Sequence, residues 1–336
     1  MKQRLLLVTI CCFCAGLTFA QKNTNLVTLR GETQGTTYQI KYLDDDQRLF
    51  KQEIERLLAD IDRCVSNYRP DSEIAVFNQS HSIRFQRPYF LDLLQKSKEV
   101  YLATEGAFDP TIYPLVEAYG FGPDRQRNIP GNMDSLLNLV GFDKISFDSI
   151  AVAKSLEHVR LDFNAIAKGY TTDKIAELLA ANNILNYLIE IGGEIRSGGE
   201  KGPDQPWKVG IENPFNLKSL SGTITLKNQG MATSGYYRNR YTRNGETFNH
   251  IINPRTGSYQ ASELFSATVV APDAASADAY ATAFMVMGPV KTIQLLASHP
   301  ELGAYLIYAG SDGKTITFIS ENIRHKVRLN TENSEN

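Results

Sequence analysis

The alternation of apolar and polar positions predicts a chain built largely from short strands. Residues 26–43 alternate with a period of two and indicate two strands separated by Gln34-Gly35-Thr36-Thr37. The same pattern, or a short apolar run between turn residues, predicts further strands elsewhere. These cover residues 187–191, 207–211, 221–226, 264–270, 304–308 and 315–319, with three shorter strands (ISF, IAVA and VRLDF) within 144–163.

Apolar residues at helical spacing predict the remaining elements. Residues 44–65 place Leu49, Ile54, Leu57, Leu58, Ile61 and Val65 on one face, with acids at the start of the segment. A second helix is expected over 88–104, and others over 165–181, 276–287 and 289–297. Because the strands come in hairpins rather than in strict alternation with helices, we expect an α+β fold with mainly antiparallel sheets flanked by helices.

Polar chemistry is concentrated between Asn228 and Gly257. The segment predicts the end of a strand, a small-residue turn at 232–235, a run rich in Tyr and Arg, and a hairpin turn at 243–246. It returns through His250, Ile251 and Ile252 into a Pro-Arg-Thr-Gly turn. Hydroxyls, backbone N–H groups, arginines and aromatics gathered in this way suit a phosphate-bearing aromatic ligand. An ordinary polar hairpin is the alternative interpretation.

The first 20 residues have the features of a secretory signal. Lys2 and Arg4 precede an apolar segment over 5–17, and Thr18-Phe19-Ala20 is a small-residue cleavage site. We therefore predict cleavage after Ala20 and an exported mature chain. A lipid anchor is the alternative, but none of the three cysteines in this segment follows the small residue that such an anchor needs.

Composition limits the class of the mature protein. The formal net charge of −2 falls to −4 when the two basic residues of the signal are removed, which argues against broad nucleic-acid binding. Only Cys64 lies outside the signal, so an internal disulfide is excluded. We expect one domain over residues 21–330 and a polar, disordered tail over 331–336.

Two segments could hold a phosphate and a metal ion. In the first, a strand ends at Asp162 and a helix begins before Lys168, so an acid, free N–H groups and a cation come together. Helix capping by Asn164 with a solvated Lys168 is the alternative. In the second, Asp278 and Thr282 lie one helical turn apart and offer a carboxylate and a hydroxyl suited to Mg²⁺. An acid that only favours the helix dipole is the alternative there.

His250 is a third candidate to carry chemistry, although a lone histidine in a strand is more often structural. The five histidines show no ligand spacing for zinc. The sequence also lacks a G-x-S-x-G elbow, a P-loop and a G-x-G-x-x-G after a strand.

Together these segments resemble the FAD:protein FMN transferase (ApbE-like) family over nearly all of the mature chain. Nine motifs follow in the family's order: 34–38 (M-G-T-T-Y), 72–78 (S-E-I…F-N), 106–110 (G-A-F-D-P), 119–122 (W-G-F-G), 162–170 (D-L-x-x-I-A-K-G-Y), 191–193 (I-G-G), 233–239 (T-S-G with Y-R-N), 250–257 (H-I-I-D-P-R-T-G) and 277–283 (A-D-A-x-A-T-A). Three positions depart from the family pattern. Gln34 replaces Met, Tyr119 replaces Trp, and Asn253 replaces Asp, which removes a charge at position 253.

The resemblance implies a T-fold-related architecture and an exported enzyme that uses FAD and Mg²⁺. Such enzymes move FMN from FAD onto a Ser or Thr hydroxyl of a client protein and release AMP. On this basis Mg²⁺ is expected at Asp278, Thr282 and a backbone oxygen near Ala165, Lys168 is expected to add positive charge, and His250 is expected to be the base. The residues expected to hold or line the flavin nucleotide are Tyr68, Phe108, Asp109, Gln34, Ala107, Asp162 and Ile252.

Two other functions share these residues. One is hydrolysis of FAD to FMN and AMP, and the other is flavin binding without turnover. Clients of the family carry an acceptor pattern resembling D-G/A-x-S/T-G-A/T. The nearest stretch here, Asp312 to Thr317, has Ile where Gly is needed, so self-modification is not expected. The expected location is the periplasm, either free or attached to the inner membrane through a client or a lipid anchor.

Overall fold

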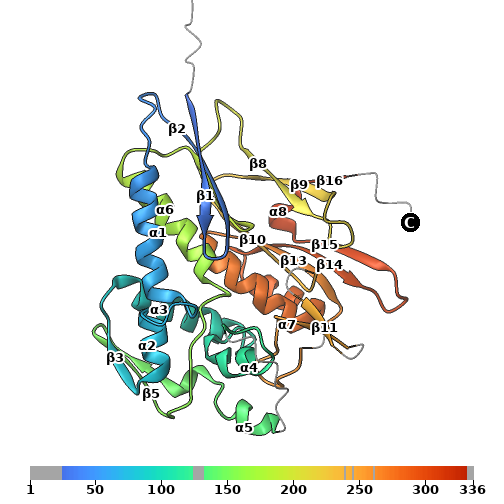
Figure 1. Cartoon of the computed structure of the whole chain (residues 1–336). Helices are drawn as coiled ribbons and strands as arrows, with labels where there is room; N and C mark the ends of the chain where they lie inside the picture. Colours follow the sequence, from blue (N-terminus) through green and yellow to red (C-terminus); the bar gives the residue numbers. More distant parts are fainter. Residues whose placement is uncertain (1–24, 124–131, 238–239, 244–245, 260–261, 331–336) are drawn as a thin grey trace, which may run out of the picture.

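An eight-stranded antiparallel sheet forms the centre of the molecule. The computed structural model describes residues 25–123, 132–237, 240–243, 246–259 and 262–330 (Figure 1). The strand order is β1-β2-β6-β7-β10-β13-β14-β15, and every neighbouring pair is antiparallel. The strands are β1 (Leu26–Thr33), β2 (Thr36–Leu43), β6 (Tyr187–Ile191), β7 (Glu194–Gly198), β10 (Gly230–Gly235), β13 (Leu264–Ala271), β14 (Gly303–Ala309) and β15 (Thr315–Ile319).

Two smaller sheets and one hairpin complete the β structure. The bounds are β8 (Trp207–Glu212), β9 (Leu220–Leu226) and β16 (Val327–Leu329) in one sheet, β3 (Ser82–Arg84), β4 (Ile145–Phe147) and β5 (Ala151–Lys154) in the other, and β11 (Arg240–Arg243) with β12 (Glu246–Asn249) in the hairpin. Apolar residues of β8 and β9 pack on residues of β7, β10, β13 and β14. The sheet β16-β9-β8 therefore covers one face of the central sheet.

Helices cover the other face of the central sheet. α6 (Ala167–Ala181) and α7 (Ala274–Ser298) lie side by side against strands β6, β7, β10 and β13 (Figure 1). Their apolar residues join the largest buried cluster, which spans residues 61 to 306. The other helical elements are α1 (Lys51–Val65), α2 (Glu73–Gln79), α3 (Pro88–Ala103), α4 (Tyr113–Ala118), α5 (Met133–Leu137), α8 (Glu321–Arg324) and the 3₁₀ turns Pro110–Ile112 and Phe142–Lys144.

Most of the predicted elements are confirmed. β6 and β15 have the predicted bounds, and α3 ends one residue before the prediction. The helix expected after residue 276 continues past 287, with a break at Gly288, where φ is +76°. The α+β class with antiparallel sheets is confirmed as well. No helix in the described part of the chain is long and apolar enough to cross a membrane.

The helix predicted from residue 44 begins later than expected, at Lys51. Asp44 accepts a hydrogen bond from the backbone N–H of Arg48 at 2.8 Å, and Gln47 has a φ of +51°. Leu49 is 71 % exposed, so its assignment to the buried face was wrong. An acid that caps a local turn competes with helix formation, and here the turn prevails over residues 44–50.

The small-residue turn predicted at Ala232–Gly235 is in fact part of strand β10, between β7 and β13. Its small residues serve close packing. A Cβ on Gly230 would lie 2.4 Å from the backbone nitrogen of Ala274 in α7. The hairpin predicted at 243–246 agrees with the pairing of β11 and β12, although residues 244–245 lie outside the described part.

The segment VRLDF was predicted as a strand and is not one. The side chain of Asn78 replaces a neighbouring strand, because its Oδ1 accepts from the N–H of Leu161 at 2.7 Å and its Nδ2 donates to the carbonyl of Leu161 at 3.0 Å. The N–H of Asp162 then donates to the carbonyl of Pro110 at 2.7 Å. These bonds place Asp162 beside the loop that carries Asp109.

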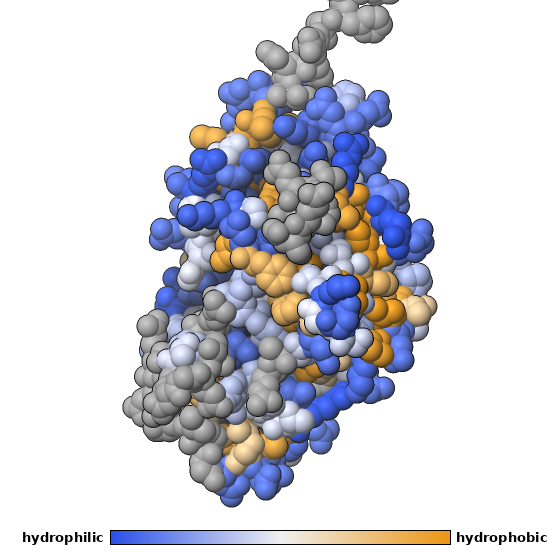
Figure 2. Space-filling model, turned by 90° about the vertical axis from the view of Figure 1, so that its right-hand side faces the viewer, coloured by the Kyte–Doolittle hydropathy of each residue, from blue (hydrophilic) through white to orange (hydrophobic). Residues whose placement is uncertain are grey.

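The surface mixes hydrophobic and hydrophilic residues. Figure 2 shows the side of the molecule at the right of Figure 1, where hydrophobic residues are exposed among hydrophilic ones. The signal over 1–20 and the tail over 331–336 lie outside the described residues and stay predictions, as does the single domain over 21–330.

Candidate active site

The site begins where α6 and α7 cross. Oδ2 of Asp278 in α7 accepts a hydrogen bond from the backbone N–H of Gly169, in the first turn of α6, at 3.1 Å. The helices approach closely because position 169 has no side chain. A Cβ there would lie 2.2 Å from the carbonyl oxygen of Ala274. The carboxylate of Asp278 is consequently buried, with 3 % exposed, at the positive end of a helix dipole.

Thr282 lies one turn beyond Asp278, and its hydroxyl is 3.2 Å from the hydroxyl of Ser234 in β10. Ala165 lies in the turn that leads into α6. The side-chain donors at this crossing are therefore the carboxylate of Asp278 and the hydroxyls of Thr282 and Ser234. Within the described residues no group of three or more His, Cys, Asp or Glu could hold a metal. Such an incomplete set of oxygen donors fits Mg²⁺, which takes its remaining ligands from water and phosphate.

Lys168 is held by a carboxylate rather than solvated. Its Nζ lies 2.8 Å from Oε1 of Glu194, the first residue of β7, and the side chain of Glu194 is only 3 % exposed. The alternative of a solvated lysine is thus wrong. Glu194 is a site residue that the sequence reasoning missed. The feature of the sequence that could have indicated it is an acid directly after the Ile191-Gly192-Gly193 turn. A charge that is buried at such a position needs a partner.

Gln34 lies in the turn between β1 and β2, with a φ of +48°. Its Nε2 donates to the hydroxyl of Thr171 in α6 at 2.8 Å, while that hydroxyl donates to the carbonyl of Ala167 at 2.7 Å. These bonds fix the amide orientation. They leave the Oε1 atom of Gln34 buried and without a partner in the described structure, so the residue presents an unused acceptor beside α6.

Asp162 is buried below α6, with 7 % exposed. It accepts bonds from the N–H of Asn164 at 2.8 Å, from its Nδ2 at 3.2 Å, and from Nδ2 of Asn67 at 3.4 Å. Burial raises the pKa of Asp162, and these bonds oppose the rise. Helix capping by Asn164 is wrong, because the residue that precedes α6 is Ile166 and Asn164 instead binds Asp162. Asn67 is a second residue that sequence reasoning missed.

The carboxylate of Asp109 is buried, with 6 % exposed, and the nearby Lys144 only partly opposes the rise in its pKa. Its Oδ1 accepts from the N–H of Thr111 at 2.8 Å and from the hydroxyl of Thr111 at 2.6 Å. Burial raises the pKa of Asp109 from 3.8 to about 6. Ala107 and Phe108 are each only 3 % exposed and belong to the largest core cluster, so they form a wall rather than a surface.

Replacing Asp109 by asparagine should therefore stabilise the protein near neutral pH. Because its pKa is higher in the folded protein than in the unfolded chain, the stabilising contribution is present below about pH 4 and is lost as the pH rises through 6. Asparagine keeps an acceptor for both bonds from Thr111 and removes the charge. We expect a gain of about 1–3 kcal/mol at pH 7.5 that shrinks towards pH 4.5. Urea unfolding at both pH values measures it.

The control for this comparison is Asp143→Asn. Asp143 is a neighbouring carboxylate whose side chain is 76 % exposed. That change should leave stability within about 0.5 kcal/mol at either pH. A loss of stability in Asp109→Asn at pH 7.5 would contradict the account of a buried charge that its neighbours compensate only in part.

His250 lies after β12, where its ring meets the edge of Phe121 at a centroid distance of 6.5 Å. The hydroxyl of Tyr68 donates to the carbonyl of Phe121 at 3.4 Å, and the side chain of Tyr68 is 60 % exposed in the chain alone. Tyr68 and His250 therefore approach the same short loop. Phe121 links them, through its carbonyl to Tyr68 and through its ring to His250.

The Pro-Arg-Thr-Gly turn is fixed to the body of the protein. Arg255 donates to the carbonyls of Thr104 and Glu105, and the hydroxyl of Tyr119 donates to the carbonyl of Gly257 at 2.8 Å. Tyr119, which stands where the family pattern has Trp, thus keeps a buried aromatic ring and a hydrogen-bond donor. Ile252 is 2 % exposed and packs in the cluster that contains Tyr119 and Phe248.

The candidate residues form two groups. Gln34, Lys168, Asp278 and Thr282 are joined through α6, α7 and their neighbouring strands. Tyr68, Asp162 and His250 lie around the loops at 67–68 and 121. Asp162 connects the groups along the chain, because it lies five residues before α6. The first group offers a positive helix end, a lysine and oxygen donors, which suit phosphates, and the second offers aromatic residues and a histidine, which suit a nucleotide ring.

Comparison with known proteins supports this interpretation. Residues 34–306 match the family model described as ApbE family. A Haemophilus influenzae protein named FAD:protein FMN transferase is 36 % identical over 314 residues, which are 88 % of this chain and 90 % of the relative. A Vibrio cholerae protein of the same name is 33 % identical, over 87 % of this chain and 90 % of the relative.

Solved structures agree. The structure titled flavin transferase ApbE from Vibrio cholerae has a TM-score of 0.79 at 32 % identity, covering 90 % of this chain and 99 % of that one. The Pseudomonas stutzeri flavinyl transferase ApbE has a TM-score of 0.80 at 29 % identity, covering 90 % and 97 %. With the family model matched over most of the chain and relatives above 30 % identity, this protein belongs to the ApbE family.

Proposed function

We propose that this protein is an Mg²⁺-dependent FAD:protein FMN transferase, which moves FMN from FAD to a Ser or Thr hydroxyl of a client protein and releases AMP. Its relatives carry the name FAD:protein FMN transferase. The observation that carries the proposal most is the crossing of α6 and α7, where Asp278 meets the first turn of α6 and Lys168 pairs with Glu194. A buried carboxylate, a lysine and a helix start at one crossing support a site for phosphates and a divalent cation.

The reaction needs positioning and charge neutralisation more than covalent help. The client hydroxyl oxygen forms a bond to the phosphorus of the FMN half of FAD. The bond from that phosphorus to the bridging oxygen breaks, and AMP leaves with the electron pair. The hydroxyl proton passes to a base. A histidine serves this role near neutral pH, and His250 is the one histidine of the motifs that carry the family resemblance.

Asp278, Thr282 and a backbone oxygen near Ala165 would hold the metal. When bound, Mg²⁺ would neutralise the charge of the phosphates. Lys168 adds a fixed positive charge, because Glu194 limits the freedom of its long side chain. Gly169 contributes its N–H group to orient Asp278.

The remaining candidates would hold FAD. Tyr68 is exposed enough to stack on a ring, and Gln34 carries the unused acceptor. Asp162 and Asp109 are buried acceptors for ring nitrogens or hydroxyls. Ala107, Phe108 and Ile252 are too buried to offer broad contact and would act as walls beneath the ligand.

Hydrolysis of FAD is the second candidate function, because water can replace the client hydroxyl at the same phosphorus. The test is to incubate the protein with FAD and Mg²⁺, with and without a client that bears the pattern D-G/A-x-S/T-G-A/T. A transferase releases AMP only, or much faster, with the client present. Equal AMP release without the client would favour the hydrolase, and no AMP under either condition would favour a flavin-binding protein without turnover.

We also propose export to the periplasm, where the protein would be free or attached to the inner membrane. The support is the basic, apolar and small-residue order of residues 1–20. The mature N-terminus should be Gln21, since cleavage is expected after Ala20. N-terminal sequencing of the protein from its native host tests this. A lipidated Cys14 at the N-terminus would contradict it and would place the protein on a membrane.

A further inference from the structure

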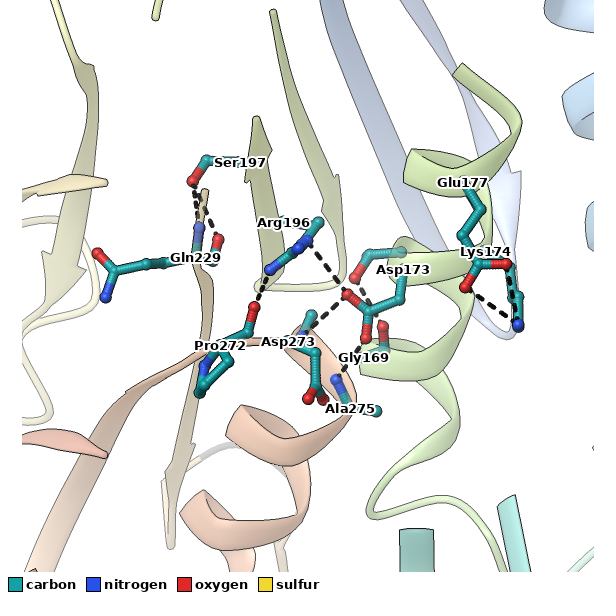
Figure 3. A network of polar contacts seen from close by, with 12 residues as sticks. Gly169, Asp173, Lys174, Glu177, Arg196, Ser197, Gln229, Pro272, Asp273 and Ala275 are labelled. Atoms are coloured by element: carbon teal, nitrogen blue, oxygen red, sulfur yellow. Dashed lines mark hydrogen bonds and ion pairs between the residues drawn. The ribbon is translucent and has the colours of Figure 1, made fainter. Parts of the chain in front are cut away.

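The N-terminus of α7 is capped by a residue from another helix. Asp173 of α6 accepts from the N–H of Ala274 at 3.0 Å with Oδ1 and from the N–H of Ala275 at 2.9 Å with Oδ2 (Figure 3). The residue that precedes α7, Asp273, accepts from the N–H of Ser276 at 2.7 Å. A helix cannot satisfy the N–H groups of its first turn internally. Here all three, from Ala274 to Ser276, have an acceptor, and two of them are accepted by Asp173.

The capping is reciprocal. Asp173 of α6 caps the start of α7, and Asp278 of α7 accepts the N–H of Gly169 at the start of α6. The two carboxylates therefore fix α7 against α6 at two points. Between them, the absence of a Cβ at Gly169 lets the carbonyl of Ala274 lie against α6. A shift of α7 along α6 would break both caps and would carry Asp278 and Thr282 with it.

Strand β7 joins the same network. Nε of Arg196 lies 3.5 Å from Oδ1 of Asp173, and its guanidinium also donates to the carbonyl of Pro272, just before α7 (Figure 3). β7 begins at Glu194, which pairs with Lys168. β7 thus contributes Glu194 as the partner of Lys168 in α6, and Arg196 as the partner of Asp173 beside the start of α7. A cleft of about 490 Å³, lined in part by Asp173, Arg196 and Asp273, opens beside the network.

Ionisation of Asp173 is unfavourable in its buried position. Burial raises its pKa to about 7, Asp273 adds to the rise, and the N–H groups of α7 and Arg196 oppose it. Tyr187 contacts Arg196, and Lys96 pairs with Asp273. Because the charged form costs folding free energy, removal of the charge offsets part of the lost capping. A neutral variant is therefore expected to fold.

We infer that Asp173 is a positioning residue for the transfer reaction: it holds α7 in the register at which Asp278 and Thr282 meet the first turn of α6. The inference rests on the proposed function for its catalytic consequence. It also makes a structural claim that is independent of turnover, namely that the bond from Gly169 to Asp278 depends on Asp173. Asp173 binds the backbone of Ala274 and Ala275 at the start of α7, so its effect on Asp278 and Thr282 passes through that helix.

The experiment compares Asp173→Asn with the parent and with Glu177→Gln, a change one turn further along α6 at a side chain that is 63 % exposed. Amide hydrogen exchange reports the N–H of Gly169, and FAD cleavage against Mg²⁺ concentration reports the metal requirement. In Asp173→Asn we expect at least tenfold faster exchange at Gly169. The Mg²⁺ concentration for half-maximal cleavage should rise at least tenfold, with cleavage largely restored by excess Mg²⁺. Glu177→Gln should match the parent in both.

A folded Asp173→Asn with the parent's exchange at Gly169 and the parent's Mg²⁺ requirement would overturn the inference. If that variant does not fold, Asp173→Glu takes its place. It keeps the charge but lengthens the side chain, and parent values for both readouts would again overturn the inference. Cleavage is measured with a client that bears the pattern D-G/A-x-S/T-G-A/T. A parent that cleaves no FAD in the presence of this client would refute the proposed function instead, while exchange at Gly169 would still decide whether Asp173 positions α7.

Discussion

Replacing Asp278 by alanine should abolish Mg²⁺-dependent turnover, with a fall of roughly 10³-fold or more in FAD cleavage. The estimate follows because a metal stabilises a transferring phosphate by several kcal/mol, and each 1.36 kcal/mol is tenfold in rate. Asp278 is the charged member of the proposed donor set, so its loss leaves only neutral oxygens from protein and water. The measurement is the rate of FAD cleavage across Mg²⁺ concentrations.

Two variants separate the metal role from the structural one. Asp278→Asn keeps an acceptor for the N–H of Gly169 but loses the charge, so it should fold like the parent and still lose most activity. Ser234→Ala removes the hydroxyl beside Thr282 without removing a proposed ligand, and it should have a much smaller effect. An Mg²⁺ dependence in Asp278→Asn equal to that of the parent would remove Asp278 from the metal site.

His250→Ala should lower the rate of FMN transfer by roughly 10²–10⁴, the usual contribution of a positioned general base. FAD affinity should change by no more than a few fold, because a base for the client hydroxyl acts on the acceptor. FAD titration and single-turnover transfer on the same preparation measure both quantities.

The pH dependence gives His250 a second test. A histidine base accepts the proton only in its neutral form, so transfer by the parent should rise with pH through the neutral range. This rise of the transfer rate with pH should be absent in His250→Ala. If binding and rate fall together, or if the folded variant transfers at the parent's rate, His250 is a structural residue and another group takes the proton.

The sequence predicted the local features of the site well. The helices that carry Lys168, Asp278 and Thr282 follow from their own periodicity and from small residues at their starts. The turn at Gln34 follows from the alternation of β1 and β2. Each of these features depends on neighbours within a few residues, which a pattern can register.

The partners of these residues could not be predicted, because they come from distant parts of the chain. Asn67 reaches Asp162 from 95 residues away, and Asp173 reaches Ala274 from 101 residues away. β7 was missed because nearly all its side chains are buried, so its charged and polar residues show no alternation between two faces. The helix predicted from residue 44 failed for a local reason, since Asp44 caps a turn before Lys51.

The most direct test of the proposed function is intact-mass analysis of a client protein after incubation with this protein, FAD and Mg²⁺. The client should bear the pattern D-G/A-x-S/T-G-A/T, and its matched control should have alanine in place of the Ser or Thr. The account predicts one covalent FMN on the client, AMP released in equal amount, and no addition to the alanine control or in the presence of a chelator. Free FMN and AMP with an unmodified client would contradict it.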